Sequence, residues 1–167
     1  MFAAGTVDWA EFTSRASALA ARAVSLLDER GVLLIGTIRS DGSPRISPVE
    51  PLFHEGELML GMMWKSLKAL DLRRDPRCTI HSAVADRTAS AGEFKAHGAA
   101  IEINEPSVRA SYGHALEAKI GFRPEGERWH LFAVRVASAA LFETGDTSRT
   151  VARWLVDRGV ETFEQGP

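Results

Sequence analysis

The sequence has almost no cysteine, no long hydrophobic run and no excess of basic charge, and each absence excludes a class of protein. Cys78 is the only cysteine among 167 residues, so no disulfide can form within the chain, and a reducing compartment is expected. No stretch approaches the roughly 18 apolar residues of a membrane-spanning helix. The first dozen residues lack the basic and apolar regions of a secretion signal. We therefore expect a cytoplasmic protein without a membrane partner.

The charge balance argues against nucleic acid as a partner. Twenty Lys and Arg stand against 22 Asp and Glu, which gives a formal net charge of -2, whereas a dedicated nucleic-acid binder normally carries a basic surplus. Hydrophobic residues make up 45% and charged residues 25% of the chain, as is typical of globular proteins. The length predicts a single domain over residues 1–167.

The hydrophobic pattern predicts a mainly β (α+β) fold. Apolar residues at helical spacing predict an N-terminal helix over residues 8–30. Residues 32–142 carry six expected strands, and two short helices lie between them. A last helix is expected over residues 147–160, with Trp154 on its apolar side. The strands are joined mostly by hairpins, which predicts a six-stranded antiparallel barrel with flanking helices. The expected strands span 32–39, 44–53, 58–62, 77–84, 93–103 and 128–142, and the short helices span 66–74 and 106–120.

The start of the helix at 66–74 carries an unusual set of polar groups. Ser66 is a typical N-cap, but Lys65 and Lys68 lie at the positive end of the helix dipole, where acidic residues are preferred. Free backbone N–H groups, a hydroxyl and two ammonium groups would converge there, and that combination suits a phosphate. The alternative is that both lysines simply lie in solvent.

A second candidate lies on the expected strand at 44–53. The period of two places Arg45 and Ser47 on one face. If this strand pairs with the strand at 58–62, Arg45 can reach the start of the helix at 66–74. The alternative is an arginine exposed at a sheet edge, which the prolines of this strand favour.

Metal and catalytic motifs are not evident in this sequence. Cys78 and His81 are spaced C-x-x-H, but no second pair follows, and the two side chains would point to opposite faces of a strand. No metal site is expected, and no residue can be named as catalytic.

Taken together, these segments resemble the pyridoxamine 5'-phosphate oxidase-like, FMN-binding split-barrel family. The matching motifs are D-G-x-P from Asp41 to Pro44, an arginine in the following strand, and S-x-K-A leading to R-x-D-P-R. The segments GEFKAHGAAIEINEP and RWHLFAVRVASAALFE are similar to the fifth and last strands of the family.

The resemblance implies a homodimer with two flavin-type cofactors held at its interface. Family members hold the cofactor phosphate with the counterparts of Arg45, Ser66 and Lys68, and the strand before the helix lies against the isoalloxazine. The C-terminal third often contributes to the neighbouring site. The residues expected at the cofactor are Arg45, Ser47, Gly61, Met62, Met63, Lys65, Ser66, Lys68 and Trp154.

Three departures from the family pattern narrow the function. Pyridoxamine phosphate oxidases carry a basic residue in place of Leu67 and a lysine in place of Glu50, and their C-terminal Arg-x-His motif is missing here. Pyridoxamine phosphate is therefore not the expected substrate. The leading hypothesis is an FMN-binding oxidoreductase. The alternatives are a reductase that uses a deazaflavin coenzyme, and a non-catalytic protein of the same fold that binds a cofactor or a tetrapyrrole.

Overall fold

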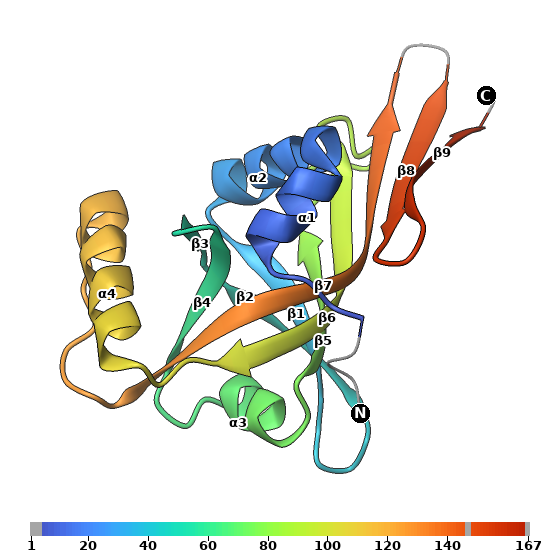
Figure 1. Cartoon of the computed structure of the whole chain (residues 1–167). Coiled ribbons are helices and arrows are strands. Elements are labelled where there is room, and N and C mark those ends of the chain that lie inside the picture. The colour runs from blue at the N-terminus through green and yellow to red at the C-terminus, as the bar shows by residue number, and fades with distance from the viewer. Residues whose placement is uncertain (1–4, 146–147, 166–167) are drawn as a thin grey trace.

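One antiparallel sheet forms the frame of the chain, with helices around it (Figure 1). The computed structural model describes residues 5–145 and 148–165, and within them the sheet has nine strands. No helix in these residues is long and apolar enough to cross a membrane. The helices are α1 (Trp9–Arg15), α2 (Ser17–Arg30), α3 (Leu67–Arg74) and α4 (Pro106–Ile120). The strands are β1 (Leu33–Ile38), β2 (Pro44–Val49), β3 (Pro51–His54), β4 (Glu57–Met63), β5 (Arg77–Ser82), β6 (Glu93–Glu102), β7 (Trp129–Thr144), β8 (Arg149–Leu155) and β9 (Gly159–Gln165).

The long strand β7 connects the parts of the sheet. The strand order is β2-β1-β5-β6-β7-β4-β3, and β8 pairs with both β7 and β9. One edge of β7 follows β6, while its other edge pairs with β4 near its start and with β8 near its end. The prediction of a mainly β chain with helices is confirmed. The predicted split barrel of six strands is not confirmed, because the nine strands of the described residues form an open path.

The predicted C-terminal helix is the clearest error. Residues 149–165 form the hairpin of β8 and β9 instead, and residue 147, where the helix was expected to begin, lies outside the described residues. The end of β7, from Ser138 to Thr144, offers an edge that β4 does not use, and β8 takes it. A strand that completes a sheet edge satisfies its backbone groups there, which outweighs a weak local preference for helix.

Two other predicted elements are divided in the structure. The N-terminal helix breaks at Ala16, whose φ of -145° and ψ of 51° are not helical. The expected strand at 44–53 divides at Glu50 into β2 and β3, and these pair with β1 and β4 respectively. This division matters for the candidate site, because β3, and not β2, is the strand that pairs with β4.

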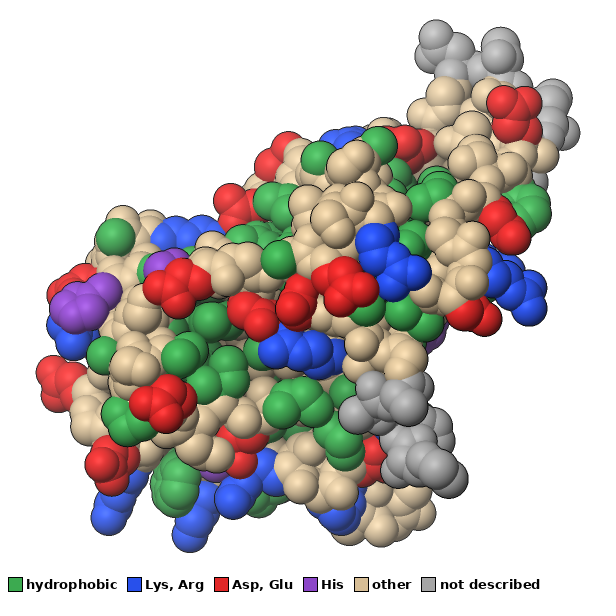
Figure 2. All heavy atoms as spheres, viewed as in Figure 1, with side chains coloured by type: hydrophobic (Ala, Val, Ile, Leu, Met, Phe, Trp, Pro, Cys, Tyr) green, Lys and Arg blue, Asp and Glu red, His purple; other side chains and the backbone are tan. Residues whose placement is uncertain are grey.

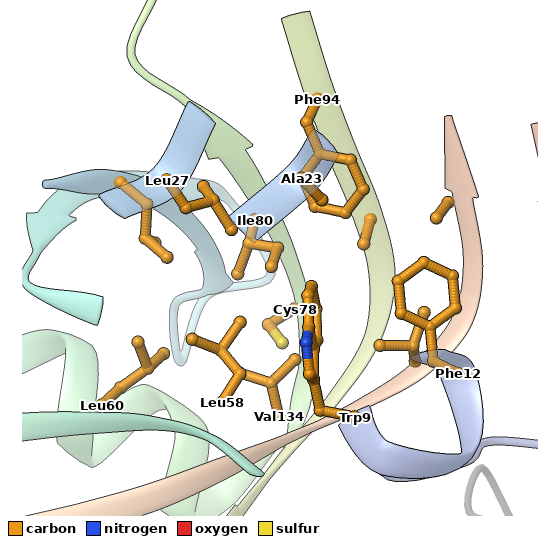
Figure 3. Packing of buried hydrophobic residues seen from close by; sticks show 14 of the residues in the cluster. Trp9, Phe12, Ala23, Leu27, Leu58, Leu60, Cys78, Ile80, Phe94 and Val134 are labelled. Atoms are coloured by element: carbon orange, nitrogen blue, oxygen red, sulfur yellow. The ribbon is translucent and has the colours of Figure 1, made fainter. Parts of the chain in front are cut away.

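The main core lies between the sheet and the helices α1 and α2. Figure 3 shows Trp9 and Phe12 of α1 among side chains from the strands. Phe12 packs edge-on against Trp154 of β8, with ring centroids 5.0 Å apart. Burial raises the pKa of the Cys78 thiol to about 12, so this cysteine is a protonated core residue.

A second, smaller core holds α4 against the sheet. Leu52, Met59 and Leu131 of the strands pack against Tyr112 and Leu116 of α4. This packing places α4 beside the last residues of β4. The chain continues from the end of β4 directly into α3.

Candidate functional site

The turn that leads into α3 presents a buried hydroxyl without a partner. Lys65 has a left-handed backbone with a φ of 56°, and the Ser66 N–H donates to the Met63 carbonyl at 3.1 Å. Ser66 is the N-cap, but its side chain makes no capping hydrogen bond. Within the described residues its Oγ is buried and has no hydrogen-bond partner. Leaving such a group unpaired costs about 1–3 kcal/mol, which is expected where a ligand is bound.

Lys68 lies beside this turn rather than in open solvent. Its Nζ donates to the Pro48 carbonyl at 2.6 Å, which ties α3 to the end of β2. Burial lowers the pKa of Lys68 from its ordinary value. The ammonium group has three donors, so two remain for another acceptor. The alternative of a solvated lysine is thus wrong for Lys68, whereas Lys65 is exposed.

Arg45 meets α3 at a different point from the one expected. Its Nε donates to Asp71 Oδ2 at 2.7 Å, and the Thr37 hydroxyl donates to the same oxygen at 3.0 Å. Arg74 lies 3.5 Å from the other carboxylate oxygen. Burial acts to raise the pKa of Asp71, but these donors outweigh it and the pKa is lowered.

The premise that brought Arg45 to the helix start is therefore wrong. Strand β2 pairs with β1 and not with β4. Arg45 and Ser47 do share the half-buried face of β2, as the period of two predicts, with Ile46 and Pro48 exposed between them. That face lies against α3, and contact of Arg45 or Ser47 with a phosphate stays a prediction.

No second strand covers the edge of β4 from Gly61 to Met63. The pairing with β3 stops at Leu60, which lies opposite Pro51, the first residue of β3, so among the described strands these three residues pair only with β7. The Gly61 backbone is hydrogen-bonded to Tyr112 instead, and the Met63 carbonyl accepts the Ser66 N–H. The edge borders a cavity of 340 Å³ whose lining includes Trp64 and Tyr112. Gly61 is required here, because a Cβ at this position would lie 2.4 Å from the Tyr112 hydroxyl oxygen. Burial raises the pKa of Tyr112 to about 12, so the phenol stays protonated.

His130, which no sequence pattern indicated, is central to this region. The imidazole is 1% exposed and stacks on Trp64, with centroids 4.8 Å apart and planes 10° apart. Its two nitrogens contact the Lys65 backbone and the Glu102 carboxylate. Only the pairing of β4 with β7, Met62 opposite His130, could have indicated this placement.

A larger cavity of 720 Å³ lies on the other side of Trp64 and is rich in arginine. The Arg109 guanidinium covers the Trp129 ring at 3.8 Å from its centroid. Arg73 of α3 pairs with Glu102 at 3.0 Å. The two cavities share Trp64 and Trp129 as lining residues, so they meet at the end of β4.

Trp154 does not belong to this region. Its side chain is fully buried in the main core, on β8 and against Phe12. The structure therefore does not bring Trp154 to the other residues expected at the cofactor, and a contact of Trp154 with a cofactor stays a prediction.

Apolar side chains are exposed at the start of α3, at Met63 and Leu67, and on the outer face of β2, at Ile46. Met63 is 80%, Ile46 74% and Leu67 61% exposed. Figure 2 shows hydrophobic and basic side chains together over the lower part of the molecule, where α3 lies in Figure 1.

Comparison with known proteins confirms the fold. No family model and no curated protein sequence matches the chain. Solved structures do, at low sequence identity. A conserved hypothetical protein from Mycobacterium tuberculosis is 19% identical with a TM-score of 0.64, over 74% of this chain and 83% of that one. A heme binding protein from Mycobacterium smegmatis is 14% identical with a TM-score of 0.63, over 89% and 88% of the two chains.

A third similar structure is that of a flavin-binding protein. It is a pyridoxamine 5'-phosphate oxidase-related, FMN binding protein from Nostoc punctiforme, 13% identical with a TM-score of 0.61 over 90% of this chain and 96% of that one. The structural resemblance to pyridoxamine 5'-phosphate oxidase-like proteins, expected from the motifs, is thus found in the fold.

Proposed function

We propose that this chain binds FMN, with the cofactor phosphate at the start of α3, and acts as a flavin-dependent oxidoreductase. The observation that carries the proposal is the buried, unpartnered Ser66 hydroxyl at a helix start flanked by Lys65 and Lys68. The fold shared with an FMN binding protein supports it.

The residues at the helix start fit a phosphate by their chemistry. The first N–H groups of an α-helix have no partner within the helix, and α3 presents them next to the Ser66 hydroxyl. Lys65 and Lys68 supply positive charge, and no acidic residue lies in the first turn. Such a set of donors binds a dianion through charge-assisted hydrogen bonds.

The edge of β4 from Gly61 to Met63, which no second strand of the described residues covers, fits the ring of the cofactor. Backbone N–H and C=O groups of an unpaired strand edge can meet the polar rim of a planar heterocycle, and the exposed Met63 can cover its face. When bound, a flavin supplies the electron transfer, while the protein binds it, orients it and sets the polarity around the ring. The missing basic contacts at Glu50 and Leu67 argue against pyridoxamine phosphate as the substrate.

We propose that the active form is a homodimer. Met63 and Leu67 are exposed at the start of α3, and Ile46 is exposed on the outer face of β2; a second copy related by two-fold symmetry would cover such apolar residues. Sedimentation of the purified protein at micromolar concentration tests this, and a monomer would exclude a cofactor site shared between subunits.

Cofactor titration tests the function. We expect one FMN per subunit, with riboflavin binding at least ten-fold more weakly because it lacks the phosphate. Reduction of the bound flavin by NADH or NADPH, followed by its absorbance, tests for an oxidoreductase. Binding of a deazaflavin coenzyme in preference to FMN would favour the first alternative.

A tetrapyrrole is the second candidate ligand, and the similarity to a heme binding protein favours including it. Hemin titration followed by its absorbance distinguishes it from the flavin. Tight hemin binding with no FMN binding would replace the flavin proposal by a non-catalytic role.

A further inference from the structure

The turn at Lys65 and Ser66 is held by a buried histidine that lies 65 residues away in the sequence. The Lys65 N–H donates to Nε2 of His130 at 3.2 Å. Lys65 is not glycine, yet its φ is 56°. A residue with a side chain adopts this left-handed conformation at a cost in energy and keeps it only where the surroundings hold it. Two hydrogen bonds hold this turn: the Ser66 N–H donates to the Met63 carbonyl within the turn, and the Lys65 N–H donates to His130 from outside it.

The hydrogen bonds of His130 determine its tautomer. Because Nε2 accepts the Lys65 N–H, it carries no proton, and the ring proton lies on Nδ1. Nδ1 then donates to Oε1 of Glu102 at 2.7 Å. Glu102 in turn pairs through its other oxygen with Arg73 at 3.0 Å. The carboxylate therefore orients the imidazole, which in turn orients the Lys65 peptide.

The ring plane of His130 is fixed as well. Trp64 stacks on it with nearly parallel planes, and the residue is almost completely buried at the start of β7. Both ends of α3 are thus tied to the same carboxylate: the N-terminal turn through His130, and the last turn through Arg73.

We propose that His130 is the positioning residue of the phosphate site, an inference that rests on the proposed function. By accepting the Lys65 N–H, His130 keeps the turn in the conformation that presents the Ser66 hydroxyl and the first N–H groups of α3 to a phosphate. A site that is already in its binding conformation spends less free energy on ordering when the ligand arrives. His130 itself does not touch the phosphate.

Two substitutions separate the two contacts of His130. The side-chain oxygen of glutamine lies about where Nε2 lies, so His130→Gln keeps an acceptor for Lys65. The side-chain amide of asparagine lies about where Nδ1 lies, so His130→Asn keeps a donor for Glu102 but loses the acceptor. Both variants are neutral and polar, and urea denaturation of each shows whether the fold is retained.

We expect FMN affinity to fall roughly ten-fold in His130→Asn, which loses the acceptor for the Lys65 N–H, and to stay within about three-fold of the parent in His130→Gln, which keeps it. Riboflavin affinity should be the same in all three proteins, because riboflavin has no phosphate. Equal FMN affinity in the three proteins would overturn the inference. So would an equal loss of FMN and riboflavin affinity in His130→Asn, because that result indicates a merely structural role.

A second measurement separates this inference from the proposed function. If the parent protein binds no FMN, the proposed function fails, and the amide resonances of Lys65 and Ser66 are then followed by NMR during titration with inorganic phosphate. Shifts in the parent and in His130→Gln, but not in His130→Asn, would support a phosphate site positioned by His130. An absence of shifts in the parent, or equal shifts in all three proteins, would overturn it.

Discussion

Two groups of cations lie along helix α3 and differ in whether a carboxylate pairs with them. Around its middle, Arg45 and Arg74 both meet the buried Asp71. At its start, Lys65 and Lys68 have no carboxylate partner among the described residues, and the hydroxyl between them is unpaired. The first group is ion-paired with a carboxylate of the chain and holds β2 against α3. The second keeps its charge and its free donors. This contrast, more than the number of cations, distinguishes a structural cluster from a ligand site.

The largest effect is expected at the Asp71 cluster. Asp71→Asn leaves the Arg45 guanidinium, whose side chain is only 19% exposed, without a counter-charge. Removing one partner of a buried pair costs about 3 kcal/mol or more, and urea denaturation measures it. Asp75→Asn is the control, because Asp75 pairs with the exposed Arg77 and such pairs contribute about 1 kcal/mol or less. Equal losses in the two variants would remove the structural role of the Asp71 cluster.

The same cluster predicts an acid-dependent loss of stability. The folded pKa of Asp71 is lowered, so the unfolded chain binds more protons over the pH range between the two pKa values, and stability rises with pH there. The contribution of Asp71 is complete above its unfolded pKa, about 3.9, and is lost as the pH falls through the folded value. The difference in unfolding free energy between the parent and Asp71→Asn should therefore shrink below about pH 4. A difference that stays constant from pH 6 to pH 2 would contradict this.

At the helix start the expected effect is on binding rather than on stability. Lys68→Ala removes a charge-assisted contact, and we expect FMN affinity to fall by about 1.5–2 kcal/mol. Riboflavin affinity should not change. Lys95→Ala is the matched control, because Lys95 is an exposed lysine paired with Glu93 on β6. If the two lysine variants bind FMN equally well, the phosphate does not lie at the start of α3.

The comparison also shows which features a sequence can predict. The helix α4 begins and ends at the predicted residues, and Ser66 is the N-cap as expected, because capping and helical periodicity involve neighbours in the chain. The partners of Arg45 and Lys65 lie 26 and 65 residues away. Those contacts depend on which strands pair. The alternating pattern of a strand predicts which face a side chain occupies, but it does not predict which residue lies beside that side chain.

The prediction of a C-terminal helix was wrong for the same reason. Val151, Trp154 and Leu155 have the i, i+3, i+4 spacing of a helix face, whereas in a strand Trp154 lies on the opposite face from the other two. The choice is made by the edge of β7 that β8 completes, which is a property of the assembled sheet. The donors at the start of α3 could thus be predicted from the sequence, but the histidine that holds their turn could not.

The smallest expected effect is also the sharpest test of the contrast within α3. Ser66→Ala removes a hydroxyl that makes no hydrogen bond within the described residues, so the unfolding free energy should stay unchanged or rise slightly, while FMN affinity falls by about 1 kcal/mol. Ser82→Ala is the matched control, since the Ser82 hydroxyl is buried and accepts the Phe94 N–H at 2.9 Å. That variant should lose about 1–2 kcal/mol of stability without a change in FMN affinity. If Ser66→Ala instead destabilises the protein as Ser82→Ala does and binds FMN normally, the hydroxyl is a structural cap. The start of α3 would then have a structural role, like the ion-paired cluster around Asp71.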